Sequence, residues 1–134
     1  GGDVLIRGSH PQGRPWTIGI QHPRDKGGLL ATVKLQGGAV VTSGDYERCW
    51  FKDGRRYHHI FDPRSGYPCC ANQSVTVYGP DPIAVDILST GLFCLPPDSV
   101  RAFVHARPQY ECVVVDSTGA LHISDGWRGV VELQ

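Results

Sequence analysis

Residues 57–68, YHHIFDPRSGYP, bring two adjacent histidines together with an Asp-Pro step and an Arg-Ser-Gly turn. A histidine can act as a base near neutral pH because its unperturbed pKa is about 6.5. Neighbouring side chains on a strand point to opposite faces, so only one of His58 and His59 can face a given site. Asp62 precedes a proline and is held extended, and Ser65-Gly66 favours a turn. The segment could carry acid–base chemistry; the alternative is a histidine that only packs or bonds to the backbone.

A second pair of polar residues, Asp86 and Thr90, lies in the apolar stretch AVDILSTGLFCL. Residues four apart on a helix lie on one face, about 40° from each other. A carboxylate and a hydroxyl so placed can both offer oxygen to Mg²⁺, which takes few protein ligands beside water or phosphate. The alternative is an aspartate favoured by the helix dipole and a threonine that bonds its own backbone.

A third candidate is the segment 42–46, TSGDY, where a predicted strand ends. Gly44 lacks a Cβ, which would let a ligand approach the backbone closely, and Ser43 precedes it. Taken alone, the segment is also an ordinary exit from a strand into a turn. The sequence has no P-loop, no dinucleotide fingerprint and no Gly-x-Ser-x-Gly elbow.

Short strands separated by turns must position these residues, because 17 glycines and 10 prolines punctuate the chain densely. Three turn segments predict hairpins, namely 36–38, 52–54 and 117–119. The predicted strands are 4–6, 16–20, 29–35, 39–42, 47–51, 57–61, 74–78, 111–115, 120–123 and 128–133.

Two helices are predicted at 82–95 and 98–107, the first with Asp81 as N-cap and Pro82 at its first position. The apolar residues of the first helix predict a broad buried arc made by Ile83, Ile87, Leu88, Leu92 and Leu95. The second helix should turn Val100, Phe103 and Val104 inward and end before Pro108. A strand-rich chain with a central helix pair predicts an α+β fold with a largely antiparallel sheet, formed by residues 1–134 as a single domain.

Length and charge narrow the class of function. The 134 residues suit one domain, and 13 Lys and Arg balance 13 Asp and Glu. Zero net charge argues against a nucleic-acid-binding protein, and no apolar run approaches the ~20 residues of a membrane helix. The chain opens on Gly-Gly-Asp and contains no methionine, so we expect a piece of a longer protein.

The five cysteines include no Cys-x-x-Cys pair, which argues against a structural zinc site. We expect Cys94 and Cys112 to be buried small hydrophobic residues. We expect the vicinal Cys69-Cys70 to be free thiols rather than a strained disulfide or a site for a soft metal.

The order of the motifs adds to what each indicates alone. The segments GGDVLIRG, PWTIGIQHP, AVVTSGDYER, YHHIFDPRSGYP, SVTVYGPD and AVDILSTGLFCL follow one another along nearly the whole chain. This string resembles the ApbE family of flavin transferases. The most specific parts are His-x-x-Asp-Pro-x-x-Gly-x-Pro, Thr-Ser-Gly-Asp-Tyr and Asp-x-x-x-Thr.

The resemblance implies the carboxy-terminal half of an ApbE-like fold, related to the T-fold. It matches Asp86 and Thr90 to the family's metal ligands for Mg²⁺. It matches His59 to the proposed catalytic base and Ile60 to a position that touches the flavin. Three further residues are weaker candidates for binding FAD: Ser43, Gly44 and Asp62. With His59 as the base, His58 is expected to point away as a solvated strand residue.

The implied activity is Mg²⁺-dependent transfer of the FMN part of FAD to a threonine of an acceptor flavoprotein, with release of AMP. Two alternatives stay open: an FAD diphosphatase that yields FMN and AMP, and a non-catalytic FAD-binding module. The family's members are usually much longer, and their amino-terminal half holds adenine-binding residues and a further magnesium ligand. We therefore expect the chain to need such a half, or another chain, as a partner. An address in the cell envelope or periplasm is expected from the family alone.

Overall fold

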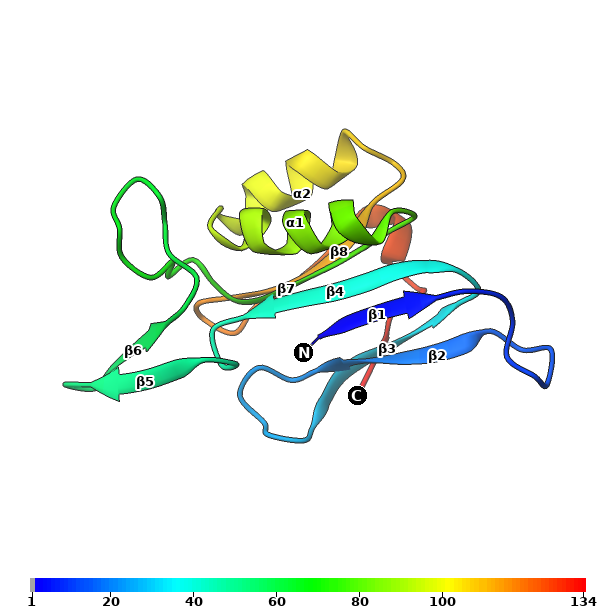
Figure 1. The fold of residues 1–134 in the computed structure, drawn as a ribbon, viewed down its shortest axis with the longest axis horizontal. Coiled ribbons are helices and arrows are strands. Elements are labelled where there is room, and N and C mark those ends of the chain that lie inside the picture. Colours follow the sequence, from blue (N-terminus) through cyan, green and yellow to red (C-terminus); the bar gives the residue numbers. More distant parts are fainter. Residues whose placement is uncertain (1) are drawn as a thin grey trace.

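The computed structural model describes residues 2–134 and has three layers. A five-stranded sheet lies between two helices on one face and a three-stranded sheet on the other (Figure 1). Every pairing between neighbouring strands is antiparallel. The expected α+β class with a largely antiparallel sheet is therefore confirmed.

The five-stranded sheet holds most of the core because both of its faces are covered. Its order is β1 (Asp3–Ile6), β4 (Gly38–Gly44), β7 (Asn72–Gly79), β8 (Glu111–Asp116) and β9 (Leu121–Ile123). Successive side chains of a strand alternate between faces. Ala39 and Val41 accordingly pack with the helices, whereas Val40 packs with the second sheet.

The second sheet has the order β10 (Glu132–Leu133), β3 (Leu29–Leu35) and β2 (Trp16–Gln21). The expected hairpin at 36–38 is wrong, because β3 and β4 belong to different sheets. Gly38 adopts φ 92°, and a Cβ there would lie 2.8 Å from the main-chain oxygen of Gly79. Gly37 and Gly38 at the start of β4 therefore let the chain cross between layers rather than reverse within one sheet.

The expected strand 128–133 is mostly wrong as well. A short 3₁₀ helix, η1 (Asp125–Trp127), and a turn come before β10, which holds only two residues. Trp127 is buried between the sheets and stacks on Tyr78 with ring centroids 5.4 Å apart. This tertiary contact favours a turn around Trp127 over a longer edge strand.

The helices α1 (Pro82–Phe93) and α2 (Pro97–His105) lie where the sequence predicts them. The Asp81 side chain accepts hydrogen bonds from two main-chain amides of the first turn of α1, at 2.9 and 3.4 Å. The expected buried arc of α1 is partly wrong, because Ile83 and Ile87 are 72% and 66% exposed. Leu92 is buried as expected, and the other buried residues of α1 are Val85, Ser89 and Phe93.

The predicted hairpin around residues 52–54 is confirmed with shorter strands, β5 (Cys49–Lys52) and β6 (Arg55–His58). Asp53 and Gly54 have φ 50° and 72°, as a two-residue hairpin turn with left-handed backbone requires. The hairpin projects from the layers (Figure 1). Because β6 ends at His58, His59 lies directly beyond the strand.

No helix within residues 2–134 is both long and apolar enough to cross a membrane. All five cysteines are free thiols, as expected for Cys69 and Cys70. Cys112 is buried as expected, whereas Cys94 is only half-buried. Burial raises the pKa of the Cys69 thiol to about 12 and that of Cys112 to about 11.

Candidate functional site

The two adjacent histidines have opposite environments. The His58 side chain is buried, with Nε2 donating to the main-chain oxygen of Cys69 at 2.8 Å and Nδ1 accepting from the Ile60 amide at 3.3 Å. Its ring also meets the Phe93 ring edge to face, with centroids 5.6 Å apart. The expectation that His58 is solvated is therefore wrong. His59 is exposed, as a base that meets an external substrate must be.

The loop after His59 is held closed by its own hydrogen bonds. Asp62 accepts from the Arg64 amide at 2.9 Å and from the Arg64 guanidinium at 3.0 and 2.9 Å. These bonds lower the pKa of the Asp62 carboxyl below its ordinary value. At the base of the loop, the Cys69 amide donates to the Ile60 oxygen at 3.0 Å. Asp62 therefore shapes the loop, and its charge is matched by Arg64.

A groove of about 610 Å³ lies between this loop and the second half of α1. His59, Ile60 and Asp62 line it from the loop, and Thr90 lines it from the helix. The structure thus brings together four predicted site residues that are up to 31 positions apart. Ile60 is only 5% exposed, so it contributes the floor of the groove rather than a free side chain.

The groove also has lining residues that the sequence analysis did not select: Phe61, Pro63, Arg64, Gly91, Cys94 and Leu95. On the helix side, Cys94 follows Thr90 by four positions and Leu95 follows Gly91 by four, and this helical spacing was the available signal. Phe61 and Arg64 stand inside the motif itself. The half-buried Cys94 thiol approaches the main-chain oxygen of Phe61 at 3.7 Å and so links the two walls.

A network of hydroxyl groups connects β4 to α1 beside the groove. The Ser43 hydroxyl is hydrogen-bonded to the Ser89 hydroxyl at 2.9 Å and to the Thr90 hydroxyl at 3.1 Å. Ser89 in turn donates to the main-chain oxygen of Asp86 at 2.9 Å. Ser43 therefore lies outside the lining of the groove and orients Thr90. No pattern in the sequence predicted this network, because the two serines are 46 positions apart.

Asp86 is exposed one helical turn before Thr90 and lines a neighbouring hollow between α1 and β1. No cluster of three His, Cys, Asp or Glu side chains that could hold a metal occurs within residues 2–134. One carboxylate and a hydroxyl one turn away fit Mg²⁺, since Mg²⁺ completes its shell with water or substrate oxygens.

Gly44, which we predicted to let a ligand approach the backbone, does not line the groove and has a packing role in the structure. It is buried, and a Cβ at this position would collide with the ring of Tyr46. Burial raises the pKa of the Tyr46 phenol to about 12. Next to it, buried Asp45 forms a bidentate pair with Arg24 at 2.6 and 2.7 Å. The exit of β4 is thus rigid, and it places Ser43 against α1.

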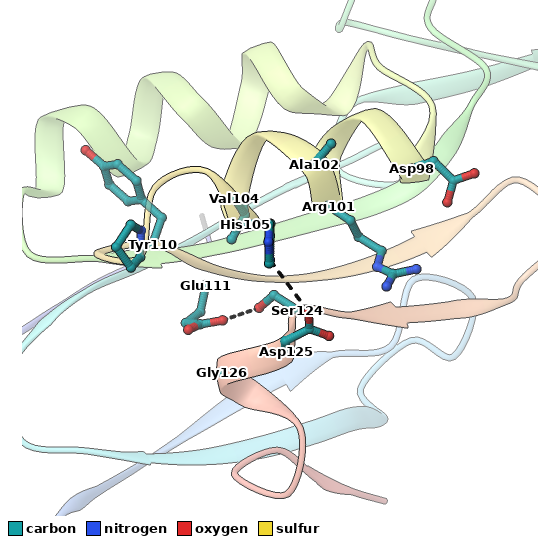
Figure 2. Close-up of a pocket in the computed structure, with 11 residues that line it drawn as sticks. Asp98, Arg101, Ala102, Val104, His105, Tyr110, Glu111, Ser124, Asp125 and Gly126 are labelled. Atoms are coloured by element: carbon teal, nitrogen blue, oxygen red, sulfur yellow. Dashed lines mark hydrogen bonds and ion pairs between the residues drawn. The ribbon is translucent and has the colours of Figure 1, made fainter.

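A second cavity of about 590 Å³ lies between α2, β8 and η1 (Figure 2). Glu111 accepts a hydrogen bond from Ser124, and His105 lies 3.7 Å from Asp125. Its remaining charged residues are Asp98 and Arg101. The lining therefore holds at least as many acidic as basic side chains. This cavity does not match an anionic diphosphate, and none of the predicted site residues lines it.

Comparisons with known proteins find similar sequences along most of the chain. A sequence profile of the ApbE family matches residues 1–114. A FAD:protein FMN transferase of Klebsiella pneumoniae (strain 342) is 39% identical over 115 residues, which are 84% of this chain and 36% of that protein. One of Treponema pallidum (strain Nichols) is 35% identical over 112 residues, covering 82% and 31%. The chain thus spans about a third of the curated relatives it matches.

Solved structures share the fold. A crystal structure of the ApbE protein from Thermotoga maritima has a TM-score of 0.88 at 37% sequence identity, covering 97% of this chain and 42% of that chain. The flavin transferase ApbE from Vibrio cholerae has a TM-score of 0.79 at 29% identity, with coverages of 97% and 42%.

Proposed function

The chain belongs to the ApbE family, and from this premise we propose that it serves the transfer of FMN from FAD to a threonine hydroxyl of an acceptor flavoprotein, releasing AMP. The names of its relatives support flavin transfer to a protein. The observation that carries the proposal is the groove in which exposed His59 faces the helix that bears Thr90. The chain spans about a third of the length of those relatives. That the transferase activity of the whole relatives also applies to this chain is therefore itself proposed.

His59 is proposed as the general base. The acceptor threonine has a weakly acidic hydroxyl, which attacks phosphorus better as its proton leaves. An exposed imidazole at the groove can take this proton, a role typically worth about 10²–10⁴-fold in rate. His58 would support it indirectly, because its two hydrogen bonds hold the backbone on either side of the loop.

Asp86 and Thr90 are the residues proposed to hold Mg²⁺. When bound there, Mg²⁺ would neutralise charge on the diphosphate of FAD and on the departing AMP. Ser43 would orient the Thr90 hydroxyl through their 3.1 Å hydrogen bond. Phosphoryl transfer needs positioning and charge neutralisation more than covalent chemistry. The hydrogen bond that orients Thr90 contributes to the positioning.

The groove would take the FMN end of FAD. Ile60 offers an apolar floor, and Asp62 maintains the loop that forms one wall. Gly44 would contribute through packing, because it leaves room for the ring of Tyr46. A location outside the cytoplasm, in the cell envelope, is proposed from the family alone.

The open groove favours one second candidate. Water reaches exposed His59 freely, so an FAD diphosphatase that yields FMN and AMP could use the same residues. In that reaction a water molecule replaces the threonine hydroxyl as the nucleophile. A module that only binds FAD is the further alternative, and it predicts that no turnover depends on His59.

The test is incubation of the protein with FAD and a threonine-bearing peptide, with Mg²⁺ or with EDTA, followed by chromatography and mass spectrometry. AMP with flavin on the peptide would establish transfer, and AMP with free FMN would establish hydrolysis. His59→Ala should lower turnover about 10²-fold or more, whereas His105→Ala, another exposed histidine outside the groove, should leave it unchanged. Turnover in Asp86→Ala that is still lost on adding EDTA would exclude Asp86 as a magnesium ligand.

A further inference from the structure

The β5–β6 hairpin with its two preceding residues, 47–58, is a projecting element that we name the arm (Figure 1). Within residues 2–134, its two strands pair only with each other. Trp50 and Phe51 near its tip are 54% and 64% exposed. Large aromatic side chains left in water on an isolated hairpin commonly mark a surface that binds something.

The arm has two different faces, because residues paired across the strands share a face. One face carries the pairs Cys49–His58 and Phe51–Arg56. At the base of the arm this inner face is fixed to the body, since His58 is buried and Arg56 lies 3.8 Å from Asp45, whereas Phe51 nearer the tip stays exposed.

The outer face of the arm carries the pairs Trp50–Tyr57 and Lys52–Arg55. The rings of Trp50 and Tyr57 stack with centroids 5.7 Å apart and an interplanar angle of 15°. The Arg55 guanidinium lies 5.6 Å from the centre of the Tyr57 ring. The outer face is thus a preformed stack of two aromatic rings bordered by two cations.

The arm has a net positive charge, whereas the chain as a whole has none. The arm holds four basic residues and two acidic ones, whereas basic and acidic residues balance over the chain at 13 each. Within residues 2–134, Arg48, Lys52 and Arg55 form no ion pair. A partner that covers this face should therefore bring negative charge.

The outer face leads directly to the candidate site. Burial alternates along the end of the arm, from half-exposed Tyr57 through buried His58 to exposed His59. His59 is thereby the next exposed side chain after Tyr57. An extended polypeptide lying along the outer face would reach the proposed base and the mouth of the groove.

We infer that the outer face of the arm binds an acidic segment of the acceptor protein beside the threonine that receives FMN. The inference rests on the proposed function and adds the chemistry of the partner. Aromatic rings would contact the apolar parts of that segment, and Lys52 and Arg55 would pair with its carboxylates. FAD is the weaker candidate for this face, because no residue of the arm lines the groove.

The experiment compares two synthetic twelve-residue peptides that share one central threonine, flanked either by Asp and Glu or by Asn and Gln. Binding is measured by calorimetry at low and high salt. We expect the acidic peptide to bind about tenfold more tightly than the neutral one, with the advantage lost at high salt. Lys52→Glu/Arg55→Glu should weaken acidic-peptide binding about tenfold or more. The matched control Arg7→Glu/Lys26→Glu changes two exposed cations elsewhere and should have little effect.

Several results would overturn the inference. Equal binding of both peptides, or equal losses in the arm variant and its control, would exclude an acidic partner on the arm. Weaker FAD binding in the arm variant would assign this face to FAD. A dimer that Trp50→Ala dissociates would assign it to a second copy of the chain, and tighter binding of a twelve-nucleotide oligo-dT would assign it to a nucleic acid.

Peptide binding requires no turnover, so the two proposals fail separately. If the acidic peptide binds selectively but receives no FMN, the proposed reaction fails and the docking role of the arm remains. Transfer of FMN to both peptides at equal KM would leave the reaction in place and remove the docking role of the arm.

Discussion

His58 and His59 are adjacent in the chain, and we predict that replacing each by alanine has a separate effect. His58 is 3% exposed and satisfies two main-chain groups, the oxygen of Cys69 and the amide of Ile60. Both partners lose that bond in His58→Ala. His59 is exposed, and its side chain makes no hydrogen bond within residues 2–134.

The magnitude follows from these contacts. A buried polar group left without a partner costs about 1–3 kcal/mol, and an edge-to-face aromatic contact such as that with Phe93 adds about 0.5–1.5 kcal/mol. Since the loop can partly relax, His58→Ala should lower the free energy of unfolding by about 3 kcal/mol. His59→Ala should change it by less than about 0.5 kcal/mol.

Urea denaturation followed by circular dichroism measures both changes. With a slope of about 2 kcal/mol per M, the midpoint of His58→Ala should fall by about 1.5 M, and that of His59→Ala should stay in place. Turnover, measured under conditions in which both variants are folded, should fall more in His59→Ala than in His58→Ala. A His58→Ala variant as stable as the parent, or a His59→Ala variant equally destabilised, would refute the assignment of the two rings.

Three further predictions concern stability, each measured by urea denaturation. Asp81→Ala removes the side-chain cap of α1 and should cost about 1 kcal/mol; no change would mean that the cap is redundant. Asn72→Ala leaves two main-chain oxygens at the end of α1 without a donor and should cost about 2 kcal/mol, so a neutral result would mean that water replaces the amide. Hydrogen bonds from Thr118 and His122 hold the pKa of Asp116 well below its ordinary value. The ionised carboxylate therefore stabilises the fold above about pH 4, and this stabilisation is lost as the pH falls further. In Asp116→Asn the urea midpoint should fall less steeply between about pH 5 and about pH 3 than in the parent. An unchanged pH dependence of the midpoint would contradict this.

The local signals in the sequence predicted most of the elements. Asp81 and Pro82 marked the start of α1, and the turn at Asp53-Gly54 marked the hairpin that became the arm. These signals are reliable because capping and left-handed turns depend on a few neighbouring residues. The same reasoning failed at 36–38, where the turn residues are correct but the two strands enter different sheets.

Side-chain environments were harder to predict than elements. Ile83 and Ile87 are exposed although both are strongly apolar, whereas Ser89 is buried. Hydrophobicity alone placed the buried arc of α1 around the wrong residues, because the hydroxyl network with Ser43 offsets the cost of burying Ser89. Partners 46 positions apart cannot be read from a helical pattern.

The sequence alone determined the family motifs, the charge balance and the order of strands and helices, since each depends on residue identity and short-range spacing. It also indicated that only one of the two adjacent histidines can face a site, because neighbouring residues of a strand face opposite ways, and the motif matched that one to His59. Only the tertiary structure showed where His58 lies: its contacts with Phe93 and Cys69 bury a ring that we expected to be solvated, and they leave His59 at the groove. It likewise joined that loop to Thr90, because the sheet brings β4, α1 and the loop after β6 together. Such contacts arise from long-range packing, which local sequence patterns do not encode.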